Sequence, residues 1–375
     1  MMVRNVKRYL FFVILLLALA GMTAVTIPLC EYISHRTDIS DLRINFAYRY
    51  HNDPYGLRGR DIDEGELFID FTRRFDSPDF GFNIAVTTDM RISTVALSSF
   101  SVIAEGDLKR YFAAGAPHFG VAGVRAKTSS AYETIGLFVR LGIGYGRFTD
   151  VTPLAKALKI NAHLLEQEAI SEHLARIDLL SIAHEIDNID TYETLADLLT
   201  VLRQIIEGSG LVRIGGLDAL NIYEMARIIE DDRHPRFCGG NVSVGIGYEI
   251  LDPMKGRNDI LATAVFNYAL ITTPQAQLLI SGSFSGAYDF LATHQIRITA
   301  AYDYIISDIV SLSALHSFSR ETRGGLPTDK HDLAIDLMLT PVEGAYVALG
   351  MRFAHRPWFL ELRKDITFRI GMDLL

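Results

Sequence analysis

Residues 241–250 alternate apolar and polar side chains without interruption, and this pattern limits the fold more than any other feature of the chain. The apolar positions are Val242, Val244, Ile246, Tyr248 and Ile250, with asparagine, serine, glycine and glutamate between them. Because successive side chains of a β-strand point to opposite faces, this segment predicts a strand with one apolar and one polar face. The alternation returns many times, so the sequence predicts an all-β antiparallel fold.

The repeats of this alternation indicate how many strands the fold contains. About 14 strands are expected, an even number that suits a bacterial barrel, and 12 is the alternative because hairpin boundaries are hard to place. Residues 93–104 and 118–127 are expected to be strands with weaker alternation. The clearer strands are predicted at 42–50, 67–71, 82–86, 135–145, 296–304, 333–340, 347–354 and 366–374.

The first 24 residues have the composition of a secretion signal. Arg4, Lys7 and Arg8 precede an apolar run at 9–20 that ends in Ala18-Leu19-Ala20, a suitable cleavage site. An uncleaved anchor is the alternative. No later stretch reaches the roughly 20 apolar residues of a membrane helix. The chain is therefore expected to cross a membrane with strands, which must close into a barrel to satisfy the backbone in lipid.

Residues 150–237 interrupt the strand pattern with a helical one, and they separate an N-terminal barrel part (38–149) from a C-terminal part (238–375). Thr152 is expected to cap a helix whose first residue is Pro153, and Asp190 with Glu193 is expected to cap another that stops at Gly208. A further helix is expected over 217–231. The insert should contain four or five short helices.

Charge and composition also set this insert apart. Residues 151–235 contain 7 lysine and arginine residues against 15 aspartate and glutamate residues, so nearly all of the net charge of −9 lies there. The same segment has no phenylalanine or tryptophan, whereas aromatic residues gather where barrels meet the membrane interfaces. The insert is expected to be an acidic soluble module, and the acidic balance disfavours nucleic-acid binding.

Loop lengths predict the orientation of the barrel. Long connections are expected at 251–258, 286–294, 320–331 and 354–365, and tight turns at 272–275, 305–307 and 340–344. Outer-membrane barrels place short turns in the periplasm and longer loops outside. The helical insert is therefore expected on the periplasmic side.

Charged side chains at the polar strand positions should point into the barrel. Charges of both signs either line an aqueous passage and set its selectivity or pair across the barrel and fill it, and both interpretations remain open. The predicted lumen residues are Arg43, Arg49, Asp70, Arg140, Glu249, Arg297, Asp303, Asp336, Arg352, Arg369 and Asp373.

Cys30 and Cys238, the two cysteines of the chain, each precede a predicted strand on the periplasmic rim. A disulfide is permitted in that oxidising compartment and would tie the N-terminal segment to the exit of the insert. Two unpaired cysteines are the equal alternative.

In these features the chain resembles bacterial outer-membrane β-barrel proteins as a class. The resemblance covers the signal at 1–24, the strands of 41–148 and 239–375, and the alternating segment from Phe368 to Leu375. It implies residence in the outer membrane, contact with the lipid bilayer, and recognition of the last strand by the barrel-insertion machinery. That strand usually closes on an aromatic residue, whereas the sequence here closes on Leu375.

Enzymatic, metal and cofactor sites receive little support from the sequence. The best match to a membrane lipid hydrolase is His316-Ser317-Phe318-Ser319, but a strand places His316 and the serines on opposite faces. His163, His173, His184 and His234 lack the short spacing of zinc ligands, and 230–232 lacks the spaced oxygens of a calcium loop. The glycines of 142–146 fit lumen positions better than a nucleotide loop. No enzyme activity, metal or cofactor is expected.

Two functions are consistent with these observations. The first is a porin-like or gated channel for small solutes, selected by the lumen charges. The second is a closed barrel that anchors the acidic insert, which would bind a basic periplasmic protein.

Overall fold

The computed structural model describes residues 28–34, 36–51, 62–93, 96–214, 216–231, 234–255, 258–287, 289, 293–307, 309–342, 345–355 and 363–372. The predicted signal at 1–24 and lumen residue Asp373 lie outside these ranges.

Fourteen antiparallel strands form one sheet in which each strand pairs with its neighbour in the sequence. This is the meander of an up-and-down barrel, as the alternation predicted. The strands are β1 Thr37–His51, β2 Ile62–Asp76, β3 Phe80–Ser93, β4 Ala96–Tyr111, β5 His118–Ser129, β6 Gly136–Asp150, β7 Phe237–Leu251, β8 Ile260–Thr273, β9 Ala276–Gly286, β10 His294–Ser307, β11 Val310–Arg323, β12 Leu326–Val342, β13 Ala345–His355 and β14 Arg363–Met372.

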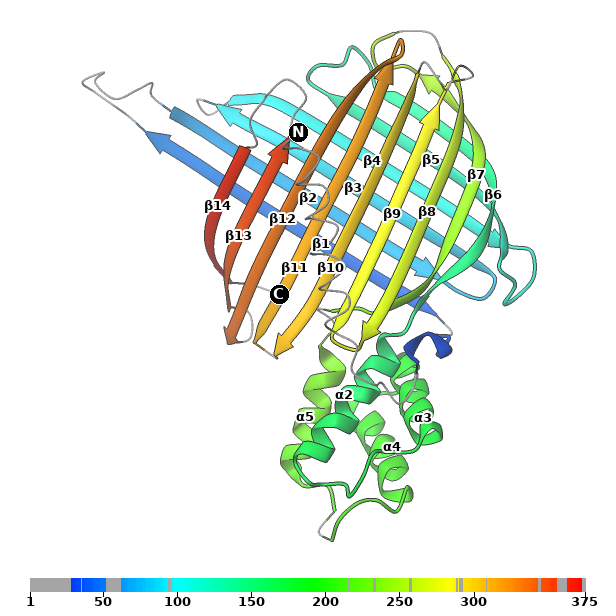
Figure 1. The fold of residues 1–375 in the computed structure, drawn as a ribbon, viewed down its shortest axis with the longest axis vertical. Coiled ribbons are helices and arrows are strands. Elements are labelled where there is room, and N and C mark those ends of the chain that lie inside the picture. The colour runs from blue at the N-terminus through cyan, green and yellow to red at the C-terminus, as the bar shows by residue number, and fades with distance from the viewer. Residues whose placement is uncertain are drawn as a thin grey trace, which may run out of the picture.

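The sheet curls so that its first and later strands form two facing walls, with β1–β6 along one and β8–β14 along the other (Figure 1). Side chains that are distant in strand order meet in the interior: Ile39 of β1 and Leu279 of β9 pack on the same buried cluster. Within the described ranges, the two edge strands β1 and β14 have no pairing with each other.

The apolar positions of the strands face outward. Leu141, Ile143 and Tyr145 of β6 are exposed, as are Val244 and Ile246 of β7. The register pairs Leu141 with Ile246 and Ile143 with Val244, so these side chains form a continuous row on the outer surface. A sheet with its large apolar residues on the outside and polar residues inside is the arrangement of a transmembrane barrel.

The helices lie together at one end of the barrel, between β6 and β7 (Figure 1). We call this end the insert end and the opposite one the distal end. The described helices are short: none could span a membrane. They are α2 Thr152–Glu166, α3 Arg176–Asp187, α4 Leu195–Gly208 and α5 Ala219–Glu230, with 3₁₀ turns η1 Leu29–Glu31 and η2 Ile189–Thr191.

The insert has a dry core of its own. Leu198, Leu202 and Ile206 of α4 share one buried face, as their helical spacing predicted. They pack with the buried residues of α2 and α3, and the same core takes in Leu29 and Tyr32 of the N-terminal segment. That segment is therefore part of the insert in space, although it precedes β1 in sequence.

Two predicted helix starts are misplaced. Thr152 is the first residue of α2 and Val151 occupies the cap position, so the start differs by one residue. The predicted cap at Asp190 with Glu193 is wrong, because α4 is capped by Thr194 and Asp197. Residues 189–191 form η2 instead, which moves the helix start downstream. Gly208 ends α4 as predicted.

The predicted long loop at 320–331 is also wrong. β11 continues to Arg323 and β12 begins at Leu326, so Gly324 and Gly325 alone make the turn. Both glycines have positive φ, 56° and 80°, which a two-residue type I′ hairpin requires. The polar residues of this region belong to strand ends rather than to a loop.

Candidate functional site

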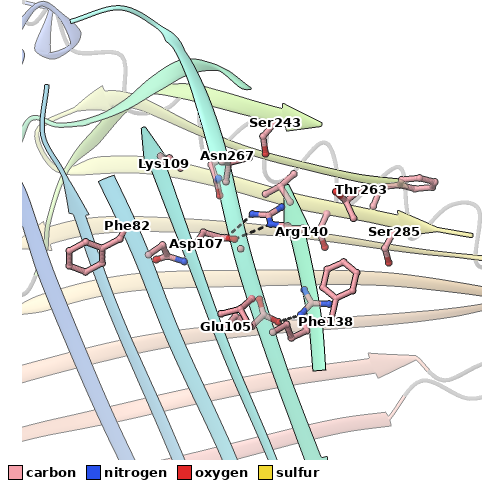
Figure 2. Close-up of a pocket in the computed structure, with 18 of the residues that line it drawn as sticks. Phe82, Glu105, Asp107, Lys109, Phe138, Arg140, Ser243, Thr263, Asn267 and Ser285 are labelled. Atoms are coloured by element: carbon pink, nitrogen blue, oxygen red, sulfur yellow. Dashed lines mark hydrogen bonds and ion pairs between the residues drawn. The ribbon is translucent and has the colours of Figure 1, made fainter. Parts of the chain in front are cut away.

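A cavity of about 340 Å³ lies inside the barrel, between the walls formed by β2–β6 and β7–β10. Figure 2 shows its lining, with Asp107 and Arg140 on one side and Ser243, Thr263, Asn267 and Ser285 on neighbouring strands. Its volume is within the range of about 300–1,000 Å³ that is typical of small-molecule sites. The cavity is the candidate functional site.

The wall from β2 to β6 carries charges of both signs, partly in ion pairs. Arg140 holds Asp107 with two nitrogens, Nη2 at 2.7 Å from Oδ2 and Nε at 2.9 Å from Oδ1. Arg125 Nε lies 2.7 Å from Glu105 Oε1. The two-point contact of Arg140 with Asp107 fixes side-chain geometry as well as charge. These pairs make one side of the cavity rigid and polar.

The wall from β7 to β9 is polar but uncharged along most of its length. Asn267 Nδ2 donates to Asn241 Oδ1 at 3.1 Å. The other side chains supply hydroxyl groups that both donate and accept hydrogen bonds. The neutral polar residues lining this side are Asn241, Ser243, Thr263, Asn267, Ser283 and Ser285.

Glycines on β6 and β7 make room for two lumen rings. A Cβ at Gly144 would lie 2.2 Å from the Phe119 ring, and a Cβ at Gly247 would lie 2.1 Å from the Phe138 ring. Any side chain at either position would displace these rings. The glycines that the sequence placed at lumen positions thus accommodate aromatic side chains inside the barrel.

An apolar cluster ends the cavity on the side of the insert. Phe148 of β6 and Phe237 of β7 have ring centroids 5.0 Å apart and are both buried. Ala269 completes the buried cluster, and Ile39 and Leu279 pack against it. We call these five residues the aromatic plug. Because Phe148 also lines the cavity, the plug forms its floor.

Arg74 of β2, a strand of the same wall as β6, covers the plug. Its guanidinium carbon lies 4.6 Å from the centroid of the Phe148 ring and 5.7 Å from that of Phe237. A cation over an aromatic face within about 6 Å is an attractive contact, and more so when it is shielded from water. The contact joins β2 to β6 and β7 in the interior of the barrel.

The two plug rings flank the two junctions of the insert. Phe148 precedes the start of α2 by four residues, and Phe237 follows the last residues of the insert. The strands remain paired up to Asp150 opposite Phe237. A displacement of the insert would therefore act on both rings through a few residues of backbone.

Arg236, next to the plug, fastens the insert to the barrel rim. Its side chain is 2% exposed. Nη1 lies 2.7 Å from Asp303 Oδ2, while Nε and Nη2 donate to the carbonyls of Pro274 and Gln275 at 2.8 and 3.1 Å. The guanidinium thus binds the β8–β9 turn and β10 together.

A second fastening is covalent. Cys30 and Cys238 form a disulfide with Cα atoms 5.4 Å apart, joining positions 208 residues apart in sequence. Around it Tyr32 Oη donates to the Ala183 carbonyl at 3.2 Å, and Ser34 Oγ to Asp187 at 2.6 Å. Burial, followed by the charge of Asp187, raises the pKa of Tyr32, which keeps its hydroxyl protonated. The N-terminal segment thereby holds α3 to β7.

The predicted lumen charges lie at several levels of the barrel. Arg140, Glu249 and Arg297 line the cavity. Asp70 accepts a hydrogen bond from Thr87 at 3.0 Å, outside the cavity. Asp303 lies at the insert end with Arg236, and His234 Nδ1 is 3.4 Å from its carboxylate. The cavity therefore brings together only part of the predicted set.

The remaining predicted positions are on the later strands or on β1. Arg352 of β13 lies 3.6 Å from Asp332 of β12. Asp336 occupies a strand position opposite Ser313 and Gly350. For three arginines only the strand position is described: Arg43 is opposite Asp70, Arg49 opposite Glu64, and Arg369 opposite Ala348.

Most charged residues of the cavity were not among the predicted ones. They lie on β2, β4 and β5, where the apolar alternation is weak or ends early. The sequence did contain a signal, since Glu105, Asp107 and Lys109 recur with a period of two. The residues concerned are Arg74, Asp76, Glu105, Asp107, Lys109, Arg125 and Lys127.

The histidines and the candidate hydrolase segment stay apart from the cavity. His316 stacks with His331 at a centroid distance of 5.8 Å. The register aligns it with Leu333 on the apolar face of the strands, and aligns Ser317 with Asp332 on the other. Within the insert, His173 is bound to Asn161 Nδ2 at 2.9 Å. The described part of the chain holds no group of three or more His, Cys, Asp or Glu placed for a metal ion.

Comparison with known proteins adds little to this geometry. No protein-family model matches the chain, and no curated protein matches its sequence. Among solved structures, the chain is similar to the CymD monoaromatic hydrocarbon channel, with a TM-score of 0.25 and 10% identity over 89% of this chain and 86% of that one.

Proposed function

We propose that this protein is a gated outer-membrane channel for small solutes, held closed at the insert end by the aromatic plug. The observation that carries the proposal is the position of the plug. It lies at the floor of a polar interior cavity, and its two rings flank the junctions of the insert. Hydrophobic constrictions close channels by excluding water.

The outer surface of the barrel supports the membrane location. Its exposed apolar rows would face lipid, and the polar interior would face water. The turn at Pro274-Gln275 is tight at the insert end. At the distal end Gly324-Gly325 makes an equally tight turn, whereas the connections at 252–259 and 287–293 are longer. This difference supports an insert in the periplasm and loops outside.

In the proposed mechanism the insert controls the plug. The disulfide and Arg236 hold the insert against the rim, so the plug rings remain packed and Arg74 remains stacked on them. A change in the position of the insert would separate Phe148 from Phe237 and let water through. The alternative is a permanently closed barrel that anchors the insert for a protein partner.

Single-channel conductance in planar bilayers distinguishes these functions. We expect little current from the native protein and steady current from F148A/F237A. A variant with 152–235 replaced by a Gly-Ser turn should also conduct, and pairing of Asp150 with Phe237 leaves a strand end that a turn can close. F46A, which removes a ring from the exposed outer surface of β1, is the control and should behave as the native protein.

Absence of current from every variant would contradict the channel function. Heat-modifiable migration in gels must first establish that each variant contains a folded barrel. If folded variants with the plug removed carry no current, the anchoring function replaces the channel, and partner capture by the insert becomes the next measurement.

A further inference from the structure

We propose that the cavity selects small anions that carry hydroxyl groups, such as hydroxylated carboxylates, over cations of the same size. This inference rests on the proposed channel function and names its class of solute. The starting observation is the charge of the lining, which contains six cationic and four acidic side chains among the residues that the structure describes. Surfaces of one sign inside a low-dielectric wall concentrate solutes of the opposite sign.

Two of the four acidic side chains are already neutralised by ion pairs within the cavity wall. Asp107 is held by two nitrogens of Arg140, and Glu105 by Arg125. Neither carboxylate is available to attract a cation without losing its arginine. The ion pairs therefore remove two acids and two cations from the balance.

The other acids are fewer than the other cations. Asp76 accepts a hydrogen bond from Tyr111 at 3.1 Å, and Glu249 lies on the opposite wall. Against them stand four cationic side chains without an ion pair among the described residues. These are Arg74, Lys109, Lys127 and Arg297.

Arg297 is the cation best placed to bind a solute. Arg74 is stacked on the plug and Lys109 lies 5.4 Å from the Phe119 ring centroid, whereas Arg297 has no hydrogen bond or ring contact within the described structure. Its direct strand partners are Ser283 and Ser319, both uncharged. A guanidinium with free donors matches the two oxygens of a carboxylate or phosphate.

The uncharged wall determines the remaining chemistry of the solute. Ser243, Thr263, Asn267 and Ser285 present hydroxyl and amide groups to the same cavity. The three hydroxyl groups need hydrogen-bond partners when water is displaced, because an unsatisfied buried polar group costs about 1–3 kcal/mol. A solute with several hydroxyl groups meets this need, and an apolar anion does not.

The test compares two polyols of similar size and opposite charge in the opened channel, F148A/F237A. Reversal potentials are measured with D-gluconate as the anion and with N-methyl-D-glucamine as the cation. We expect gluconate to be at least about threefold more permeant, from the cation surplus of the lining. Glutamine at position 297 (R297Q) should remove most of that preference. R91Q is the matched control, because Arg91 pairs with Glu66 at 3.7 Å outside the cavity.

Equal permeability of the two polyols, or a preference for N-methyl-D-glucamine, would overturn the anion inference while leaving the channel intact. Retention of full preference in R297Q would overturn the role of Arg297. If no variant conducts, the channel itself fails, and calorimetric titration of the folded protein with gluconate decides the inference separately. Binding that is lost in R297Q would support it, and absence of binding to the parent protein would refute it.

Discussion

The barrel and the insert use the same apolar residues in opposite ways. Leu141 and Ile246 on the strands are 70% and 68% exposed, whereas Leu202 on α4 is fully buried. The insert folds by removing leucine and isoleucine from water, which stabilises it by about 1.5–3 kcal/mol per large side chain. In the barrel the backbone pairs strand to strand and leaves these side chains on the outer surface, where the lipid of the proposed membrane would cover them. One chain therefore contains two regions built for two solvents.

The junction of the barrel and the insert follows neither the burial pattern of the insert nor that of the barrel. Arg236 is buried there among carbonyls and one carboxylate, and the plug is an apolar cluster inside a polar lumen. Both features occupy the few residues around the exit of the insert. The exceptions to the two folding rules therefore lie at the junction of the insert and the barrel, where the proposed gate lies.

The largest effect is expected from Arg236→Ala, which breaks the connection between the regions. Removing the guanidinium takes a donor from Asp303 and from the carbonyls of Pro274 and Gln275. Each buried acceptor left without a partner costs about 1–3 kcal/mol. We expect the insert to loosen from the rim, with faster hydrogen exchange in α2 and α5 but an intact barrel.

Arg203→Ala is the control for this prediction. Arg203 pairs with Glu207 at 2.7 Å on the exposed surface of α4. Such a pair contributes about 0.3–0.5 kcal/mol. Equal exchange rates in the two variants would mean that Arg236 does not fasten the insert.

A smaller effect is expected from truncating a leucine, and it should depend on the region. Leu202→Ala leaves a cavity in the core of the insert and should cost about 2–5 kcal/mol. Leu141→Ala changes only the lipid-facing surface, so it should cost much less in vesicles. Denaturant unfolding, with helical circular dichroism for the insert and gel migration for the barrel, measures both. Equal costs would contradict the assignment of two solvents.

The sequence predicted the strands of the barrel better than the charged residues that line its cavity, and the reason is physical. Alternation is strong where one strand face meets lipid, so β7 with its row from Val242 to Ile250 was evident. The alternation weakens at strand ends that extend beyond the outer apolar rows, as at Arg74 and Asp76. It also weakens where β4 has a register shift opposite Arg91 and Ile92. Cavity charges on those strands were therefore missed.

The plug and the Arg236 site depend on contacts between distant positions. Phe148 and Phe237 are 89 residues apart in the sequence. Their strands nevertheless pair, because the insert begins and ends at neighbouring positions of the barrel. No local pattern shows that Arg74, four strands from Phe148 in the sheet, will cover both rings. The cysteines suggested a link between the N-terminal segment and the insert exit, but left paired and unpaired states equally open.

The smallest effect is expected from removing a helix cap within the insert, where local sequence signals should still affect the stability of α4. Thr194 Oγ1 accepts a hydrogen bond from the Asp197 amide at 3.3 Å, and Asp197 Oδ2 accepts one from the Thr194 amide at 3.1 Å. Thr194→Ala removes half of this capping box and should cost about 1 kcal/mol. Thr200, in the middle of the same helix, instead donates to the Ala196 carbonyl at 2.8 Å. Alanine there has the higher helix propensity, so Thr200→Ala should be neutral or slightly stabilising. Thermal loss of the helical signal measures both, and equal shifts would show that α4 depends on tertiary packing alone.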